Sequence, residues 1–200
     1  MVFCADCGGG SAGNSSGSCA NAAACGGDIL GAWKITSSCV SVSASMFDAS
    51  CPTATVSASS LKMTGTVTYS ADLTYTADST ISGNIAVTLP ASCLTVNGIT
   101  VTCTQLTQAL MNMADPSFAS ASCVAAGSGC TCTVPEPAQT TNETGTYTTT
   151  SAGLLTQSPA NGTADLSDYC VKGSALTESP HPGSSMMGQS VSGVITLARQ

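Results

Sequence analysis

The sequence predicts an all-β fold, an antiparallel β-barrel of about eight to ten strands with one short helix, stapled by disulfides. Several short segments alternate apolar residues with Thr and Ser and are separated by turn residues, which is the pattern of half-buried strands. Twelve cysteines stand beside only four Lys and Arg residues. An even number at this density indicates a disulfide framework formed in an oxidising compartment. A disulfide-rich β-sandwich is the alternative architecture.

The charge pattern excludes several classes of partner. Charged residues make up only 8% of the chain, the net charge is −7 and the basic residues are scattered, so neither a nucleic-acid footprint nor a polybasic membrane patch is present. No apolar run is long enough for a transmembrane helix. The segment before Cys4 is too short for the apolar part of a signal peptide. Because the cysteines indicate an oxidising compartment, we expect an extracellular or cell-surface protein. We expect this chain to be a mature form or to have lost its leader.

Residues 1–28 differ in composition from the rest. They are mainly Gly, Ser, Ala and Asn with four cysteines, and such a segment is a flexible arm unless its cysteines pin it. Bulky apolar residues begin to alternate at residue 29. We predict an N-terminal arm over 1–28 and one barrel domain over 29–200, with an irregular Cys-rich insertion around 103–142.

The first half of the barrel domain contains four predicted strands and a hairpin. The hairpin covers 93–103, where Asn97-Gly98 is the preferred pair for a two-residue type I′ turn. In that register Cys93 and Cys103 point to opposite faces, which argues against a bridge between them. The four strands are expected around 29–42, 61–69, 73–81 and 85–89.

The second half contains the one predicted helix, over 104–113. Apolar residues recur there at i, i+3, i+4 and i+7 from Leu106, and Pro116 ends the run. Residues 117–142 are expected to be irregular. Further strands are expected over 145–150, 153–156, 169–176 and 191–199.

Three short motifs in chain order resemble those of the lipocalin superfamily, over about residues 28–200. They are a G-x-W on the first strand, an S-D-Y in place of the family's T-D-Y-like turn, and a basic residue that ends the last strand. The resemblance implies that Trp33 plugs the closed end of the barrel and that Arg199 lies over its ring, where a guanidinium can stack on the indole. The residues that carry the likeness are Gly31, Trp33, Ser167, Asp168, Tyr169 and Arg199.

The resemblance implies a non-enzymatic, secreted protein whose barrel binds a small hydrophobic ligand. In the alternative interpretation, the inward-facing side chains named below fill the barrel and leave no cavity for a ligand. The alternative function is a structural subunit of an extracellular filament or surface layer, in which residues 1–28 join copies of the chain. The candidate ligand-contacting residues are Ile35, Met63, Tyr69, Tyr75, Val87 and Tyr147.

No catalytic, cofactor or metal site is predicted. His181 is the only histidine and lies in a turn-like Ser-Pro-His-Pro-Gly segment, and the eleven carboxylates do not cluster in the sequence. The Gly-Gly-Gly at 8–10 lacks the flanking strand and helix of a phosphate-binding loop. We therefore expect no enzyme activity and no cofactor.

The cysteines are expected to pair as disulfides, each stabilising the fold by about 2–4 kcal/mol. Cys39–Cys51 is the expected local bridge because both residues flank a loop, and bridges among the four N-terminal cysteines come second. A four-thiolate zinc site made by those four is the alternative. The full set is Cys4, Cys7, Cys19, Cys25, Cys39, Cys51, Cys93, Cys103, Cys123, Cys130, Cys132 and Cys170.

Overall fold

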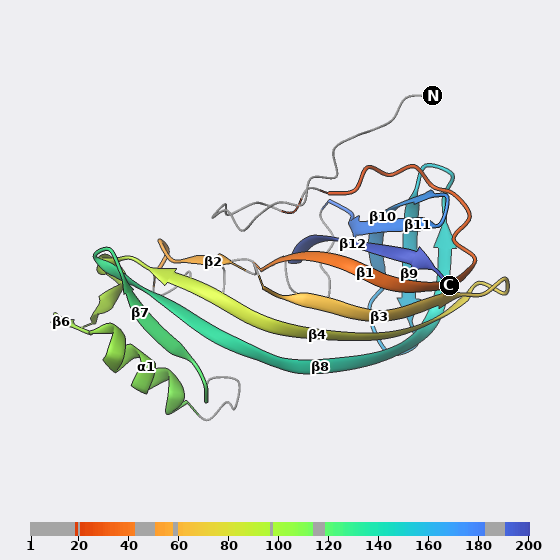
Figure 1. Ribbon diagram of the computed structural model, residues 1–200. Helices are drawn as coiled ribbons and strands as arrows, with labels where there is room; N and C mark the ends of the chain where they lie inside the picture. The colour runs from red at the N-terminus through yellow and green to blue at the C-terminus, as the bar shows by residue number, and fades with distance from the viewer. Residues whose placement is uncertain are drawn as a thin grey trace.

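Hydrogen bonds run through eight antiparallel strands and close into a ring, so the predicted all-β barrel class is confirmed (Figure 1). The computed structural model describes residues 19, 21–42, 51–57, 60–96, 98–113, 119–182 and 191–200. Around the ring, each strand pairs with the next ring strand along the chain, and the last pairs with the first. This is the up-and-down arrangement of an antiparallel barrel. The ring strands are β1 (Gly31–Val42), β3 (Lys62–Tyr69), β4 (Thr74–Leu89), β8 (Gly129–Thr149), β9 (Leu154–Pro159), β10 (Asp165–Lys172), β11 (Ala175–Pro180) and β12 (Val191–Arg199).

The inward and outward faces of the ring follow the period-two pattern of the sequence. On β1, Trp33 and Ile35 are buried while Lys34 between them is exposed. On β3, Val67 and Tyr69 are buried in the same way. Successive side chains of a strand point to opposite faces, so the buried residues of β1 and β3 meet those of the other ring strands inside the barrel. The far parts of β4 and β8 contribute instead to a second buried cluster, with Cys130 and Cys132.

Strands β4 and β8 are longer than predicted. They stay paired from Thr74 and Thr146 to Leu89 and Cys130, with an irregularity after Ile81. The two strands expected at 73–81 and 85–89 are therefore one. The irregular structure expected over 117–142 is wrong for 122–126, which forms β7 (Ser122–Ala126), and for 129–142, which belongs to β8. Figure 1 shows the pair as a long curved ribbon that leaves the barrel.

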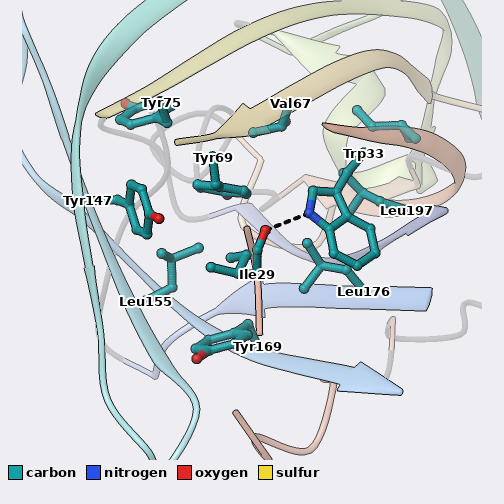
Figure 2. Close-up of a cluster of buried hydrophobic side chains, with 11 residues drawn as sticks. Ile29, Trp33, Val67, Tyr69, Tyr75, Tyr147, Leu155, Tyr169, Leu176 and Leu197 are labelled. Carbon is teal, nitrogen blue, oxygen red and sulfur yellow. Dashed lines mark hydrogen bonds between the residues drawn. The ribbon is translucent and has the colours of Figure 1, made fainter. Parts of the chain in front are cut away.

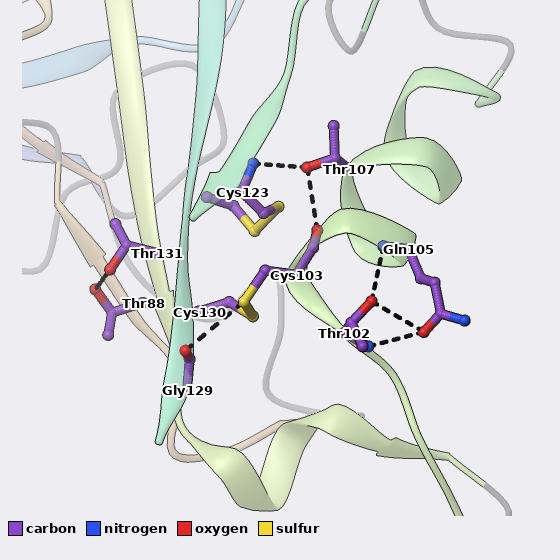
Figure 3. Close-up of a disulfide and its surroundings, with 10 residues drawn as sticks. Thr88, Thr102, Cys103, Gln105, Thr107, Cys123, Gly129, Cys130 and Thr131 are labelled. Carbon is purple, nitrogen blue, oxygen red and sulfur yellow. Dashed lines mark hydrogen bonds between the residues drawn. A yellow bond between two sulfur atoms is a disulfide. The ribbon is translucent and has the colours of Figure 1, made fainter. Parts of the chain in front are cut away.

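A smaller second layer covers the far end of this ribbon. The predicted helix is confirmed as α1 (Cys103–Met111), and its start is held by a capping box between Thr102 and Gln105. The Thr107 hydroxyl donates to the Cys103 carbonyl and accepts from the Cys123 N–H, which ties α1 to β7 (Figure 3). No helix among the described residues is both long and apolar enough to cross a membrane. The remaining elements there are β2 (Thr55–Ser57), η2 (Ala91–Leu94), β5 (Thr95–Val96), β6 (Ile99–Thr100) and β7 (Ser122–Ala126).

The predicted hairpin register is confirmed, although the paired strands are only two residues long. Val96 pairs with Ile99 and Thr95 pairs with Thr100. Cys93 and Cys103 do not bridge to each other, as that register required.

Five disulfides join the described cysteines, and the pairings expected for Cys19, Cys25, Cys39 and Cys51 are wrong. Cys39 does not bridge Cys51, and the N-terminal cysteines Cys19 and Cys25 do not bridge each other. Both pair with strand residues, which also excludes them from a four-thiolate zinc site; Cys4 and Cys7 lie outside the described residues. The sequence separations of the five bridges run from 9 residues, for Cys123–Cys132, to 145 residues, for Cys25–Cys170. The bridges are Cys19–Cys39, Cys25–Cys170, Cys51–Cys93, Cys103–Cys130 and Cys123–Cys132.

The described part of the predicted N-terminal arm, residues 21–28, lies against the barrel. Cys25 is bonded to Cys170 of β10, and Gly26 forms a parallel bridge with the same residue. The Ala22 N–H donates to the Ser179 hydroxyl, at 3.1 Å. This segment is therefore fixed to β10 and β11, as the sequence required of an arm pinned by its cysteines. Residues 1–18 and 20, the rest of the predicted arm, lie outside the described residues.

Candidate functional site

One end of the barrel is filled by apolar side chains. Trp33 is fully buried, and its indole Nε1 donates to the Ile29 carbonyl oxygen at 2.7 Å (Figure 2). Ile29 belongs to the segment before β1 and is itself buried in the same core cluster. Three more ring strands each contribute a fully buried leucine to the cluster, namely Leu155, Leu176 and Leu197.

Arg199 closes this end from outside. Its guanidinium carbon lies 4.4 Å from the centroid of the Trp33 ring. Its Nη1 and Nη2 atoms donate to the carbonyl oxygens of Leu30 and Asp28, at 2.6 and 3.0 Å. Gly31 accommodates this contact, because it has φ +111° and a Cβ there would lie 3.3 Å from Arg199 Nη1. The Trp33–Arg199 contact is the one that the motif order led us to expect.

Next to this apolar plug, three tyrosines pack together in the lumen. The rings of Tyr69 and Tyr147 meet edge to face with centroids 4.9 Å apart, and Tyr69 and Tyr75 have centroids 6.2 Å apart. Such pairs stabilise a core by about 0.5–1.5 kcal/mol beyond the buried area. Tyr147 donates its hydroxyl proton to the Ser70 carbonyl, whereas the hydroxyl groups of the other two reach carboxyl groups inside the barrel.

We define the lumen cluster as the polar side chains that meet around these hydroxyls. The Tyr69 hydroxyl donates to Glu178 Oε1 at 3.1 Å and accepts from Gln157 Nε2 at 3.2 Å. The Tyr75 hydroxyl donates to Glu143. Asp165 lies near enough for the charge of Glu143 to act on it. The members therefore come from six of the eight ring strands: Tyr69 (β3), Tyr75 (β4), Glu143 (β8), Gln157 (β9), Asp165 (β10) and Glu178 (β11).

The environment of the lumen cluster favours neutral over charged groups. Burial raises the pKa of Glu178 to about 7, although the hydrogen bond from Tyr69 acts the other way. Burial, followed by the nearby charge of Glu143, raises the pKa of Asp165. Burial, followed by the hydrogen bond to the Glu143 carboxylate, raises the pKa of Tyr75. Within the described residues, no Lys or Arg side chain forms a salt bridge with a member of the lumen cluster, and the one contact between His and a carboxylate joins His181 to Asp168.

Exposure increases across the lumen cluster. Glu178 is 4% exposed, whereas Glu143, Gln157 and Asp165 are half-buried. The cluster thus runs from the interior towards solvent and presents mainly hydrogen-bond acceptors. An arrangement of this kind suits a ligand that donates hydrogen bonds or carries positive charge.

The residues predicted to line a ligand site mostly lie in the barrel core. Ile35, Tyr69, Tyr75 and Tyr147 belong to one buried cluster, and Met63 packs against it. Val87 is buried elsewhere: it lies on the part of β4 that pairs with β2 and with Cys132 of β8. These side chains fill much of the space that a hydrophobic ligand would need.

The sequence reasoning missed the carboxyl groups of the lumen. The eleven carboxylates are dispersed along the chain, but the fold brings Glu143, Asp165 and Glu178 into one barrel interior. A signal was present on β11, where Leu176, Glu178 and Pro180 alternate and all three are buried. A charged residue at an inward-facing strand position is the feature that would have identified the cluster.

The S-D-Y motif has a structural role in β10. Ser167 and Tyr169 are buried, and the Tyr169 hydroxyl donates to the Gly27 carbonyl at 3.2 Å. Asp168 lies 2.7 Å from Nδ1 of His181. The motif therefore holds the N-terminal segment and the end of β11 against the barrel.

No protein-family model, curated protein or solved structure matches this chain.

Proposed function

We propose that this chain is a non-enzymatic, extracellular or cell-surface barrel protein that binds a small ligand at the lumen cluster. The observation that carries the proposal is the convergence of polar side chains from six ring strands inside a barrel whose other end is sealed. Five disulfides support an oxidising compartment. The lipocalin-like order of motifs supports a carrier function.

The chemistry of the lumen cluster narrows the ligand class. The apolar end is occupied by the protein's own Trp33 and leucines, so a purely hydrophobic ligand has little room there. Three carboxyl groups with no paired cation favour a ligand with a positively charged group. A small primary amine with a short apolar body is the simplest ligand that combines these features.

Calorimetric titration with linear alkylamines, and with alcohols and carboxylic acids of the same chain length, tests this proposal. We expect the amines to bind and the alcohols and acids to bind at least tenfold more weakly. Asp165→Asn should weaken amine binding, whereas Asp78→Asn, which changes an exposed carboxylate of β4, should not. Equal affinity for amines and alcohols, or no binding by any of the three series, would contradict the proposal.

A structural subunit is the second candidate, favoured by the edges of the sheet. β2 and β7 are the terminal strands of the ten-stranded order, so within the described residues each presents an edge that a strand of another copy could extend. Residues 21–28, however, contact their own barrel. Sedimentation of the non-reduced protein distinguishes the candidates: concentration-dependent growth into long assemblies supports the subunit, and a monomer supports the carrier.

A further inference from the structure

A hydrogen-bond chain crosses the lumen between strands that are not neighbours. Gln157 of β9 donates to Tyr69 of β3, and Tyr69 donates to Glu178 of β11. None of these three strands pairs with another of the three in the ring. These two hydrogen bonds therefore link three strands of the barrel wall through its interior, and we call them the cross-brace.

Glu178 is the buried end of this cross-brace. It pairs in register with Tyr169 of β10 and Ile195 of β12, and it is almost fully shielded from solvent. Arg199 donates to two main-chain carbonyls and lies over the Trp33 ring. Within the described residues, no Lys, Arg or His side chain forms a salt bridge with Glu178. The titratable groups that face the lumen from the surrounding strands are acids, whereas the lysines of these strands, Lys62 and Lys172, are exposed. The lumen-facing groups are Tyr69 (β3), Tyr75 (β4), Glu143 and Tyr147 (β8), Asp165 and Tyr169 (β10).

We propose that Glu178 is a pH-sensitive lock, which braces the barrel when protonated and loosens it when ionised. A protonated carboxyl accepts the Tyr69 hydrogen bond and needs no counter-ion in the lumen. An ionised one keeps the hydrogen bond but places an uncompensated charge in a low-dielectric interior surrounded by other acids. The lock is a property of the fold and does not depend on the ligand proposed above.

The direction of the pH effect follows from linkage. Burial raises the pKa of Glu178 from 4.5 to about 7, so between these values the native protein holds more protons than the unfolded chain. Stability is then fully present below about pH 4.5, falls as the pH rises, and levels off above about pH 7. The difference of about 2.5 units (7 minus 4.5) corresponds to an increase of about 300-fold in the unfolding equilibrium constant. The raised pKa of Asp165 acts in the same direction.

Denaturant unfolding of the wild type, Glu178→Gln and Asp78→Asn across about pH 4 to pH 9 tests the lock. Gln keeps the shape and the acceptor oxygen of Glu178 but cannot ionise. We expect Glu178→Gln to lose most of the roughly 300-fold pH dependence and to be more stable than the wild type above pH 7. Asp78→Asn should keep the wild-type profile. A wild-type profile that is flat or rises between about pH 5 and pH 7, or a Glu178→Gln profile that matches it, would overturn the proposal.

A direct titration decides the question even if Glu178→Gln does not fold. The chain has three glutamates, so carbon NMR of the wild type labelled at the Glu carboxyl carbon gives three signals. We expect one of them to titrate with a midpoint near pH 7, at the same pH as the loss of stability. If all three titrate at the ordinary value for glutamate, Glu178 is not the lock.

Discussion

Replacing Trp33 by Ala should destabilise the barrel strongly, because this residue fills its closed end. Removing a fully buried Trp side chain costs about 3–5 kcal/mol. The substitution also removes the hydrogen bond to the Ile29 carbonyl, which adds about 1 kcal/mol. We therefore expect the free energy of unfolding to fall by about 4–6 kcal/mol, a large part of the stability of a typical domain.

Guanidinium unfolding followed by circular dichroism measures this loss. Trp33 is the only tryptophan, so fluorescence cannot follow the Ala variant but reports the plug directly in variants that retain it. Trp33→Phe is the milder comparison, because it keeps a ring and loses the Nε1 donor. A Trp33→Ala variant within about 1 kcal/mol of the wild type would refute the reasoning that the ring is packed as a plug.

Further predictions concern the cap, the disulfides and the lumen. Arg199→Met should lower the free energy of unfolding by about 1–2 kcal/mol and shift the Trp33 fluorescence emission, because the indole loses its cation and two carbonyls lose their donors. An unchanged emission would contradict the stacking of Arg199 on Trp33. Replacing both Cys25 and Cys170 by Ser should lower the melting temperature more than replacing both Cys123 and Cys132, because the first bridge closes a loop of 145 residues and the second a loop of 9. The reverse order would show that loop-closure entropy does not determine how much each disulfide stabilises the fold. Amine affinity should rise as the pH rises through about 7, because ionised Glu178 is the better acceptor; calorimetry that finds the opposite trend would contradict the assigned ligand class.

The elements with a clear local pattern could be predicted from the sequence. Trp33 and Ile35 flank the exposed Lys34 on β1, and the sequence pair Asn97-Gly98 correctly predicted the register of the β5–β6 hairpin. The contact between Trp33 and Arg199 was expected from the resemblance of the three motifs to those of lipocalins, and it lies where the first and last ring strands pair.

Other elements could not be predicted, because their sequence lacks alternation or a strong turn pair. Residues 137–142 of β8 are exposed on both faces, so the strand shows no apolar period. The segment expected as one strand over 169–176 is the β10–β11 hairpin, which turns at Gly173 with φ +62°.

The long-range disulfides and the lumen cluster depend on the tertiary fold. Cys51 bridges Cys93 across 42 residues, and Glu143 and Glu178 lie on strands that are distant in sequence. No local pattern records such contacts, because they exist only once the chain has folded. The sequence could indicate that a barrel forms but not which polar side chains it encloses.

Native mass spectrometry of the non-reduced protein from its natural source tests the carrier function most directly. The proposed function predicts a monomer that carries a discrete small additional mass, which is released when the lumen carboxyl groups are replaced in Glu143→Gln and Asp165→Asn. A ladder of multimers with no added mass, or a bare monomer that takes up no amine, would contradict it.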